Sequence, residues 1–454
     1  MWSEYPFREH EVCSQKTALS FVDSIWELFG GLLQGVPTVI VPADALVEPE
    51  ALVQTLHDHD VTRIWVVPSL LRVLLDGHPD LDLRLPALTF WVTTGEPLSP
   101  ELYERFAERM PHATLYNVYG TSEFWDATWW DPTREPAPHR CVPIGRPLWN
   151  VKAYALDRHG RPVPIGVPGE LHVGGDGLPR GYIGRPDMTT EKLVPDPLAN
   201  ASGALVWRTG DVVRFLSDGN LEFLERLDNQ IKLRGFRIEP SEIEVALRRY
   251  PAVEQATVVL RGDPEREDAR LVAYVVTRRE TETSPPELRS LLQATLPAHM
   301  IPAAFVFLEE LPLTPSGKVD RARLPEPGYA AHRSSETVAP RNAVEEVLVT
   351  IWGDLLGVPH VGVEDNFFND LGGHSLLGTT LVSRVRDAFD VELPLRRLFD
   401  APTVAEMAEA LGEEASDPAA LEQTAQLLLR VAGLSDEAVQ TMLAERVPRQ
   451  PPVS

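Results

Sequence analysis

Helix-like and strand-like patterns alternate between Phe21 and about Gly120, and this alternation limits the possible folds more than any other feature of the chain. Helices are expected at residues 24–33, 48–59, 70–75 and 100–110, and strands at residues 38–41, 63–67, 88–93 and 114–118. Strands that alternate with helices predict parallel βαβ units in an α/β domain. Functional residues gather at the carboxyl ends of such strands.

The first of these helices has two signals of its own. Ser24 and Glu27 fit the S-x-x-E pattern of a helix N-terminus. An apolar face at helical spacing is formed by Ile25, Leu28, Phe29, Leu32 and Leu33. Both signals predict an amphipathic helix that begins near Ser24.

The sequence changes character after Pro143, where short strand patterns with Gly and Pro turns continue to Glu225. Beyond a basic stretch at 226–238, a compact α+β pattern begins with a helix that has a capping-box signal at Ser241 and Glu244. A segment rich in Pro, Ala, Ser, Glu and Thr follows and reads as a linker. A helical unit comes next, followed by an amphipathic helical stretch and a Pro-rich end.

Composition excludes several functions for the 454-residue chain. Its net charge of −25 argues against binding to nucleic acid or to an anionic membrane, because both need a basic surface. Two cysteines, Cys13 and Cys141, fit neither a disulfide framework nor a zinc site. No signal peptide and no membrane-spanning apolar run is visible. A cytoplasmic protein is therefore the expectation.

The residues from Asp370 to Leu377 form the strongest local motif. Two glycines precede Ser375, which opens an expected helix whose apolar face contains Leu377, Leu381, Val385 and Phe389. A phosphodiester on Ser375 would sit at the helix N-terminus, where backbone N–H groups favour an anion. Most G-G-x-S strings, however, are only a serine cap behind a glycine turn.

The segments around this motif extend the likeness. Asp365–Phe368 precedes it and Leu398–Val404 follows it, and the whole stretch resembles the phosphopantetheine carrier domains of nonribosomal peptide synthetases. This resemblance implies an all-α four-helix domain, phosphopantetheine attached to Ser375, and a phosphopantetheinyl transferase as a partner.

A second resemblance covers nearly everything from Phe21 to Leu324. Asn117–Glu123 is similar to a nucleotide-binding loop of the synthetases' adenylation domains, with Thr121 in place of the usual proline. A loop after a strand can offer an aromatic ring, a hydroxyl and a carboxylate to a nucleotide and its Mg²⁺. The resemblance implies adenine contacts for Tyr119 and Asn117, a phosphate contact for Ser122, and Mg²⁺ binding by Glu123. Alone, Y-G-x-x-E is weak and usually marks a turn.

Further blocks of the adenylation family follow in order. Residues 169–175 and 180–182 resemble a largely structural block, and Arg208–Asp211 resembles the ribose-binding block, which implies that Asp211 binds the ribose. Residues 226–235 match the hinge region, with Glu225 in place of a glycine. By this resemblance Asp228 is the hinge and Arg226 a ribose contact. Without these neighbours, the same strings would be turns and a charged hairpin.

The stretch Leu311–Arg321 nearly matches the family's catalytic-lysine loop. The ammonium group of Lys318 on a flexible loop could neutralise charge on the phosphate and the substrate carboxylate as they react. A loop lysine is ordinarily only solvated, so this assignment depends on the resemblance.

Together the resemblances imply a multidomain chain. It comprises an α/β adenylation core fragment with a β-rich subdomain (1–227), a small α+β C-terminal adenylation subdomain (228–325), a linker (326–340), the carrier domain (341–413) and a helical C-terminal tail (414–454). The implied cofactors are ATP, Mg²⁺ and phosphopantetheine. The implied partners are an amino acid and neighbouring synthetase modules such as condensation or thioesterase domains.

The substrate pocket departs from the family pattern. Relatives have an aspartate for the substrate α-amino group in a Ser-Phe-Asp-x-Ser segment, whereas this chain has Val22 there and Asp23 one residue later. The other pocket positions matched by motif are Trp26, Val92, Thr94, Val118, Asp126 and Ala127. The displaced carboxylate suggests a β-amino acid. Two alternatives stay open: Asp23 only caps the helix, or Asp126 binds the amine.

The family's Ser/Thr/Gly-rich phosphate loop is not found in the sequence. We therefore expect the rear portion of an adenylation domain, with a mis-called start, a separate N-terminal half or a decayed gene as explanations. The favoured function is activation of an amino acid as aminoacyl-AMP and its transfer to the carrier as a thioester. The alternative is a carrier protein with a non-adenylating platform that is loaded in trans. A free acyl-CoA synthetase is disfavoured because a carrier domain is fused to the chain.

Overall fold

The computed structural model describes all residues except 1, 47, 135–141, 200–202, 229, 263–268, 279–282, 315–318, 327–337, 359, 368–370, 372, 374, 392, 395–396, 399–400, 416 and 433–454. The chain forms two compact units. The first comprises Met1–Ile243 with Leu260–Arg270, and the second comprises Glu244–Val259 with Leu271–Ser454.

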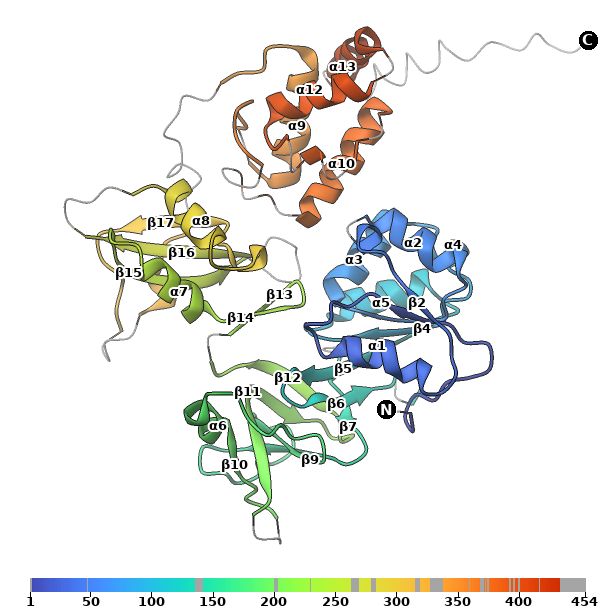
Figure 1. Cartoon of the computed structure of the whole chain (residues 1–454), viewed down its shortest axis with the longest axis vertical. Coiled ribbons are helices and arrows are strands. Elements are labelled where there is room, and N and C mark those ends of the chain that lie inside the picture. Colours follow the sequence, from blue (N-terminus) through green and yellow to red (C-terminus); the bar gives the residue numbers. More distant parts are fainter. Residues whose placement is uncertain are drawn as a thin grey trace, which may run out of the picture. The chain divides into compact units, whose positions relative to one another are not determined.

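A seven-stranded sheet with helices around it organises the beginning of the first unit (Figure 1). Its order is β2-β1-β3-β4-β5-β6-β7, and pairing is parallel from β2 through β5 and antiparallel beyond. The strands are β1 (Cys13–Gln15), β2 (Thr38–Ile40), β3 (Arg63–Val66), β4 (Phe90–Thr93), β5 (Thr114–Thr121), β6 (Trp125–Trp130) and β7 (Arg146–Pro147). The helices are α1 (Asp23–Leu32), α2 (Pro49–Asp58), α3 (Pro68–Gly77), α4 (Leu81–Arg84) and α5 (Pro100–Arg109), with a 3₁₀ turn at Asp44–Leu46. The predicted parallel βαβ arrangement is confirmed.

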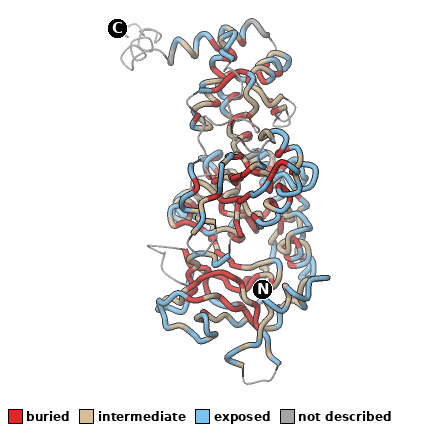
Figure 2. Tube along the Cα trace, turned by 90° about the vertical axis from the view of Figure 1, so that its left-hand side faces the viewer, coloured by how far each residue is buried: buried red, intermediate tan, exposed pale blue. Residues whose placement is uncertain are grey.

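The core of this sheet explains why its strands read as continuous apolar runs. Every residue of β3 is buried, and α2, α3 and α5 each bury an apolar stripe. Figure 2 shows the buried residues as red stretches of the chain trace, with exposed pale blue segments around them. Strands covered on both faces bury both sets of alternating side chains, which removes the period-2 pattern.

The apolar face of α1 does not pack into this core, although such a face usually does. Ile25, Phe29, Leu32 and Leu33 are 47–65% exposed, whereas the buried residues of α1 are Ser24, Trp26, Glu27, Gly30 and Gly31. The helix begins at Asp23, close to the predicted start at Ser24, but Ser24 and Glu27 do not make the predicted capping contacts. The Ser24 hydroxyl donates to the Phe21 carbonyl, and Glu27 accepts hydrogen bonds from the backbone N–H groups of Lys16 and Thr17.

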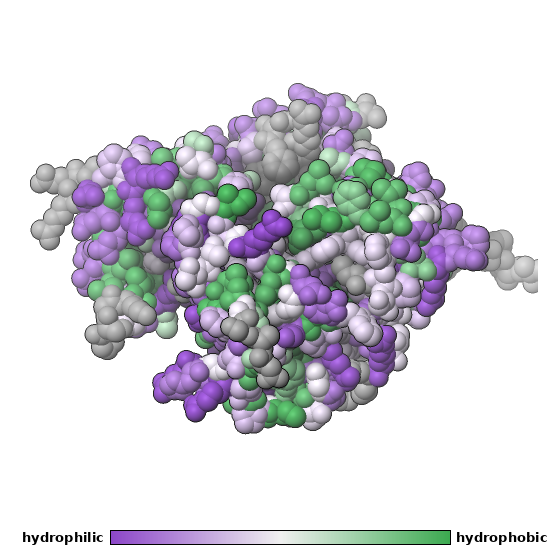
Figure 3. Space-filling view, turned by 60° about the horizontal axis from the view of Figure 1, so that its bottom comes forward, coloured by the Kyte–Doolittle hydropathy of each residue, from purple (hydrophilic) through white to green (hydrophobic). Residues whose placement is uncertain are grey.

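A second, antiparallel sheet completes the β-rich region. Its order is β10-β11-β9-β8, with β12 paired to β11. The elements are β8 (Val151–Leu156), β9 (Gly169–Gly175), α6 (Pro186–Lys192), β10 (Leu193–Pro195), β11 (Leu205–Phe215) and β12 (Leu221–Arg226). Green apolar residues lie among purple polar ones on the face of the molecule shown in Figure 3.

A hairpin formed by β13 (Ile231–Leu233) and β14 (Phe236–Ile238) belongs to the first unit. Its two turn residues, Arg234 and Gly235, have φ angles of 52° and 75°, as a tight two-residue hairpin turn requires. The backbone N–H of Gly235 donates to Glu96 Oε1 at 2.5 Å. Contacts of this kind place the hairpin with the first unit.

The second unit begins with a small α+β part. It contains the end of α7 (Pro240–Arg248), a three-stranded sheet of β15 (Val253–Arg261), β16 (Arg270–Thr277) and β17 (Ala304–Leu308), and α8 (Pro285–Gln293). Short 3₁₀ turns lie at Ala298–Met300 and Arg321–Arg323. The predicted capping-box role of Glu244 is not seen, because its carboxylate accepts hydrogen bonds from the Thr257 hydroxyl and the Val258 N–H.

Four helices share the last core: α9 (Ala343–Leu356), α10 (Ser375–Phe389), α12 (Val404–Glu414) and α13 (Pro418–Ala432). The predicted apolar face of α10 is buried there, with Leu381 and Val385 fully enclosed. Leu421 and Ala425 of α13 belong to the same core, so it extends beyond residue 413. Among the described helices, none has the length and apolar character needed to cross a bilayer.

Candidate functional site

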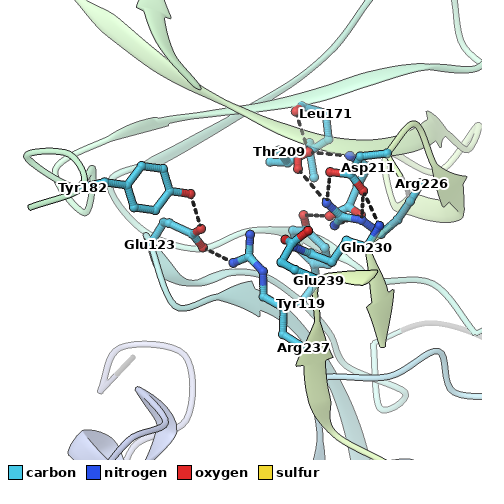
Figure 4. A network of polar contacts seen from close by, with 11 residues as sticks. Tyr119, Glu123, Leu171, Tyr182, Thr209, Asp211, Arg226, Gln230, Arg237 and Glu239 are labelled. Atoms are coloured by element: carbon cyan, nitrogen blue, oxygen red, sulfur yellow. Dashed lines mark hydrogen bonds and ion pairs between the residues drawn. The ribbon is translucent and has the colours of Figure 1, made fainter. Parts of the chain in front are cut away.

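A buried carboxylate, Asp211, is held from two sides (Figure 4). The Tyr119 hydroxyl from β5 donates to Asp211 Oδ2 at 2.5 Å, and Arg226 Nη1 from β12 donates to Oδ1 at 2.6 Å. Asp211 on β11 is fully buried and lies opposite Arg226 in the strand register. Burial, reinforced by the Asp211 charge, raises the pKa of Tyr119 well above its usual value. The tyrosine therefore stays a neutral donor.

The Thr209–Gly210 turn shapes this site. The Thr209 hydroxyl donates to the Leu171 carbonyl and accepts from the Asp211 N–H. Gly210 has a φ of 79°, and a Cβ there would lie 2.9 Å from Asp228 Oδ2. Glycine is therefore required between the threonine and the aspartate.

Asp228, the predicted hinge residue, forms a bidentate ion pair. Arg226 Nε and Nη2 donate to its two carboxylate oxygens, each at 2.6 Å. Although burial alone would lower it, the pKa of Arg226 is raised by Asp228 and Asp211. One guanidinium thus links the predicted ribose acceptor to the predicted hinge.

Glu123 is the centre of a second set of contacts. The Tyr182 hydroxyl donates to Oε1 at 2.6 Å, and Arg237 Nη1 donates to Oε2 at 2.5 Å (Figure 4). Burial alone would raise the pKa of Glu123, but the Arg237 hydrogen bond and charge outweigh burial and lower it. Among the described residues, no group of three or more His, Cys, Asp or Glu could hold a metal. A Mg²⁺ ion does not fit at Glu123 while Arg237 occupies its carboxylate.

Three residues of this region were not predicted from the sequence. Tyr182 belongs to the block that was taken as structural, and Arg237 lies just beyond the hinge match. Lys232 Nζ lies 5.4 Å from the centre of the Tyr119 ring, and burial lowers its pKa. The cluster of basic residues between 226 and 238 was the sequence signal that could have indicated Lys232 and Arg237, but the pattern does not show which basic residues face the site.

The predicted pocket residues divide between two clusters. Trp26, Val92 and Val118 lie in one buried cluster, which Tyr5, Trp65, Trp129 and Leu148 complete. Thr94 is also buried, whereas Ala127 packs in the core of the second sheet.

The two predicted acidic pocket residues differ in exposure, because Asp126 is buried and Asp23 is half-buried. Asp126 lies on β6 opposite Gly120 of β5 and is 7% exposed. Burial raises the pKa of Asp23 to about 6. Burial, followed by the charge of Asp23, raises the pKa of Asp126 well above its usual value. The charges of these two aspartates therefore act on one another.

The remaining predicted residues are not gathered into this network. Ser122 is exposed, and the Asn117 amide donates to the Pro143 carbonyl at 2.9 Å. Lys318 lies outside the described residues. Ser375 begins α10, but its side chain is not described.

Comparisons with known families identify three regions. A family described as AMP-binding enzyme matches residues 1–183, and the AMP-binding enzyme C-terminal domain matches residues 242–318. A phosphopantetheine attachment site family matches residues 346–411. The AMP-binding enzymes use ATP and Mg²⁺.

Curated relatives are large synthetases. Tyrocidine synthase 3 of Brevibacillus parabrevis is 41% identical over 409 residues, which is 90% of this chain and 6% of the relative. A dimodular nonribosomal peptide synthase of Bacillus subtilis is 41% identical over 397 residues, which is 87% of this chain and 16% of the relative. The chain thus spans only a small part of the relatives it matches.

Solved structures agree with these matches. Holo-PA1221, described as a nonribosomal peptide synthetase protein with adenylation and carrier (PCP) domains, superposes with a TM-score of 0.72 at 27% identity over 90% of this chain and 67% of that one. IdnL1 gives a TM-score of 0.62 at 29% identity over 68% and 63% of the two chains. The chain therefore belongs to the nonribosomal peptide synthetases, as an adenylation region of the AMP-binding enzymes fused to a phosphopantetheine carrier domain.

Proposed function

We propose that this chain activates an amino acid and tethers it to its own carrier domain. In the first step, the substrate carboxylate attacks the α-phosphorus of ATP, so that an acyl–phosphate bond forms and pyrophosphate leaves. In the second step, a thiolate attacks the acyl carbon, so that a thioester forms and AMP leaves. Phosphopantetheine on Ser375 would supply that thiol. The observation that carries the proposal is the Asp211 network in a chain that also contains a carrier domain.

The Asp211 network supports a ribose site. Both carboxylate oxygens already accept one hydrogen bond each, yet a carboxylate oxygen can accept two. Asp211 has lone pairs left for the ribose hydroxyls while Tyr119 and Arg226 hold it in position, and because it is fully buried, neighbouring residues would have to move aside for the ribose to reach it. Asn117 and Ser122 would contact the adenine and the phosphates, as proposed from the resemblance.

The contacts of Glu123 support a role close to the phosphates. Its lowered pKa keeps it ionised, and Mg²⁺ would bind it only once Arg237 leaves the carboxylate. Lys318 would add a positive charge where negative charge develops on the reacting phosphate and carboxylate.

The hinge assignment is supported by the geometry of Arg226. Its guanidinium binds Asp211 and Asp228 at once, so rotation of the backbone at residue 228 would break or remake a bidentate ion pair. We propose a boundary of the adenylation subdomains at this position. Ser375, at the start of α10, would receive the acyl group through its phosphopantetheine arm.

The substrate is proposed to be a β-amino acid. Asp23 stands one residue after the position that the family uses for the α-amino group, and burial raises its pKa. A carboxylate displaced along the helix start would meet an ammonium farther from the substrate carboxylate.

An alternative function is a carrier protein with a non-adenylating platform that another enzyme loads. It is favoured by the lack of a Ser/Thr/Gly-rich phosphate loop within the 454 residues. The exposed apolar face of α1 fits either function, since a separately supplied phosphate-loop half could cover it.

Amino-acid-dependent pyrophosphate exchange separates the two functions. We expect background exchange by the chain alone and measurable exchange once a phosphate-loop half is added. In the reconstituted system, Lys318→Ala should lower exchange by roughly two to three orders of magnitude, as loss of one key electrostatic donor does. If no exchange appears even after the phosphate-loop half is added, the alternative is favoured, in which another enzyme loads the carrier domain.

A further inference from the structure

Phe367, which lies between α9 and α10 in the sequence, is enclosed in the core of the carrier domain. Its side chain is 0% exposed, and its ring packs edge-on against Trp352 of α9 with 5.1 Å between the ring centroids. Both residues belong to the core that the four helices share. Protein interiors are close-packed, so a ring enclosed in this way has little freedom to move aside.

The backbone of Phe367 is bound to the start of α12. Its N–H donates to the Pro402 carbonyl at 2.7 Å, and the preceding residue, Asn366, forms an antiparallel bridge with Thr403. Thr403 is the N-cap of α12 and forms a capping box with Glu406. The position of Phe367 is therefore set from α12, a helix that follows α10 in the sequence.

Gly373 packs directly against Phe367. It is buried and comes shortly before Ser375, where α10 begins. Its N–H donates to the Phe367 carbonyl at 2.7 Å. A Cβ on Gly373 would lie 2.4 Å from two carbons of the Phe367 ring and 2.6 Å from the Phe367 carbonyl oxygen, much closer than van der Waals contact allows. Any side chain at residue 373 must therefore push this backbone away from Phe367.

This close approach distinguishes Gly373 from the other glycines of the carrier domain whose surroundings are described. For Gly353 and Gly362, the nearest atom to an added Cβ is 3.1 Å away, and for Gly412 on α12 no described atom lies within 4 Å. The tightest of these positions is the one beside the proposed attachment serine. The Phe367 ring thus restricts the path by which the backbone enters α10.

We propose that Phe367 is a positioning residue for phosphopantetheine attachment, because it fixes, through Gly373, the backbone that leads into Ser375. This inference rests on the proposed function and deepens it. In the attachment step, the Ser375 hydroxyl attacks the phosphorus next to the pantetheine arm of CoA, and its proton passes to a base of the transferase. A serine–phosphate bond forms, the P–O bond within the pyrophosphate breaks, and 3′,5′-ADP leaves. A displaced serine would lose the alignment that this attack needs.

The kinetics of attachment to the full chain, measured by intact mass with a phosphopantetheinyl transferase and CoA, test this role. A displacement of about 1 Å can slow a reaction about a hundredfold, so Gly373→Ala should lower kcat by roughly that factor. The KM for the chain should change little, because a buried substitution leaves the surface that the transferase meets unchanged. Gly412→Ala makes the same substitution where a Cβ has room, so this matched control should keep the wild-type kcat.

A second control separates positioning from stability. Leu348 of α9 is 0% exposed, and Leu348→Ala removes core volume without changing either residue of the Phe367–Gly373 pair. It should lower the urea midpoint but leave kcat, expressed per folded molecule, close to the wild-type value. If Gly373→Ala and Leu348→Ala show the same kcat per folded molecule, the position of the backbone plays no part and the inference is overturned.

A compensating substitution keeps the test decisive if Gly373→Ala is destabilised. Phe367→Leu, added to Gly373→Ala, removes the ring that the new Cβ meets, so kcat per folded molecule should rise at least about threefold above that of Gly373→Ala. Recovery should be partial, because the contact with the carbonyl oxygen at 2.6 Å persists. No rise in the double variant, or a wild-type kcat in Gly373→Ala, would overturn the inference. If the wild-type chain is not modified at all, the proposed carrier function itself fails.

Discussion

Two buried aspartates of the first unit, Asp211 and Asp126, differ in their hydrogen-bond partners, although burying a carboxyl group costs free energy in both cases. Asp211 is fully enclosed and satisfied by Tyr119 and Arg226 from neighbouring strands. Asp126 is nearly as buried, yet its Oδ2 atom has no partner among the described residues. The proposed nucleotide region therefore has its carboxylate already held in place, whereas the proposed substrate region contains a carboxyl oxygen without a partner among the described residues.

This difference teaches how rigidity and specificity are divided between the two regions. A carboxylate with two charge-assisted or short hydrogen bonds is fixed in geometry before a nucleotide arrives. An unpaired acid in an aromatic cluster lowers stability locally and gains a partner only when a suitable ligand binds. The first arrangement suits a cosubstrate shared by the whole family, and the second suits a substrate that varies.

The largest effect is expected from breaking the satisfied site. Asp211→Asn removes the charge from two hydrogen bonds at once, those from Tyr119 and Arg226, although Arg226 keeps its pair with Asp228; it should cost about 3–5 kcal/mol in the free energy of unfolding. Asp126→Asn, at an acid whose pKa burial raises and whose Oδ2 atom has no hydrogen bond to lose among the described residues, should change that free energy by less than about 1 kcal/mol. Urea denaturation of both variants measures the contrast, and equal losses would remove the distinction.

A smaller effect is expected when Asp211 keeps its charge but loses one donor. Tyr119→Phe deletes the hydrogen bond to Oδ2 and should cost about 1.5–3 kcal/mol, the usual range for a bond to a charged group. Tyr103→Phe, at a tyrosine that packs edge-on against Trp130, is the control, and we expect it to cost less than Tyr119→Phe. A Tyr119→Phe variant as stable as the control would show that the short contact contributes little.

The smallest effect is expected from pH in the substrate region. Because the pKa of Asp23 is raised to about 6, the carboxylate that we propose to bind the substrate ammonium forms as the pH rises through 6. Affinity for β-alanine should fall about tenfold per pH unit below that value. The raised pKa also means that the stability this proton provides is present at low pH and is lost between about pH 4 and 6. If the affinity for β-alanine, measured by fluorescence titration, stays constant from about pH 5 to 7, Asp23 is not the charged partner of the substrate ammonium.

The fold was largely predictable because the chain's patterns are local. Alternating elements predicted the parallel sheet, and the spacing of Leu381, Val385 and Phe389 predicted the buried face of α10. The apolar face of α1 was expected to pack inside the domain, but its residues are exposed. An apolar helical stripe indicates a surface that favours burial, and it does not identify what would cover that surface. Glu27 fitted a capping pattern but accepts hydrogen bonds from a preceding loop instead.

The site was predictable only where residue types are tied to a motif. In the T-G-D string, Gly210 has a positive φ of 79°, and a glycine in a short turn motif is a sequence signal for such a backbone conformation. Arg237 and Lys232 join the site through a hairpin that brings residues more than a hundred positions apart together, and no spacing encodes that contact. Tyr5 and the unpaired oxygen of Asp126 depend on three-dimensional packing alone.

The central claim is that this chain activates a substrate for a carrier domain of its own, and the attachment site tests it most directly. The intact mass of the chain, measured after incubation with a phosphopantetheinyl transferase and CoA, should increase by one phosphopantetheine group. The same treatment of Ser375→Ala should leave the mass unchanged. Modification that persists in Ser375→Ala, or no modification of the wild-type chain, would contradict the account.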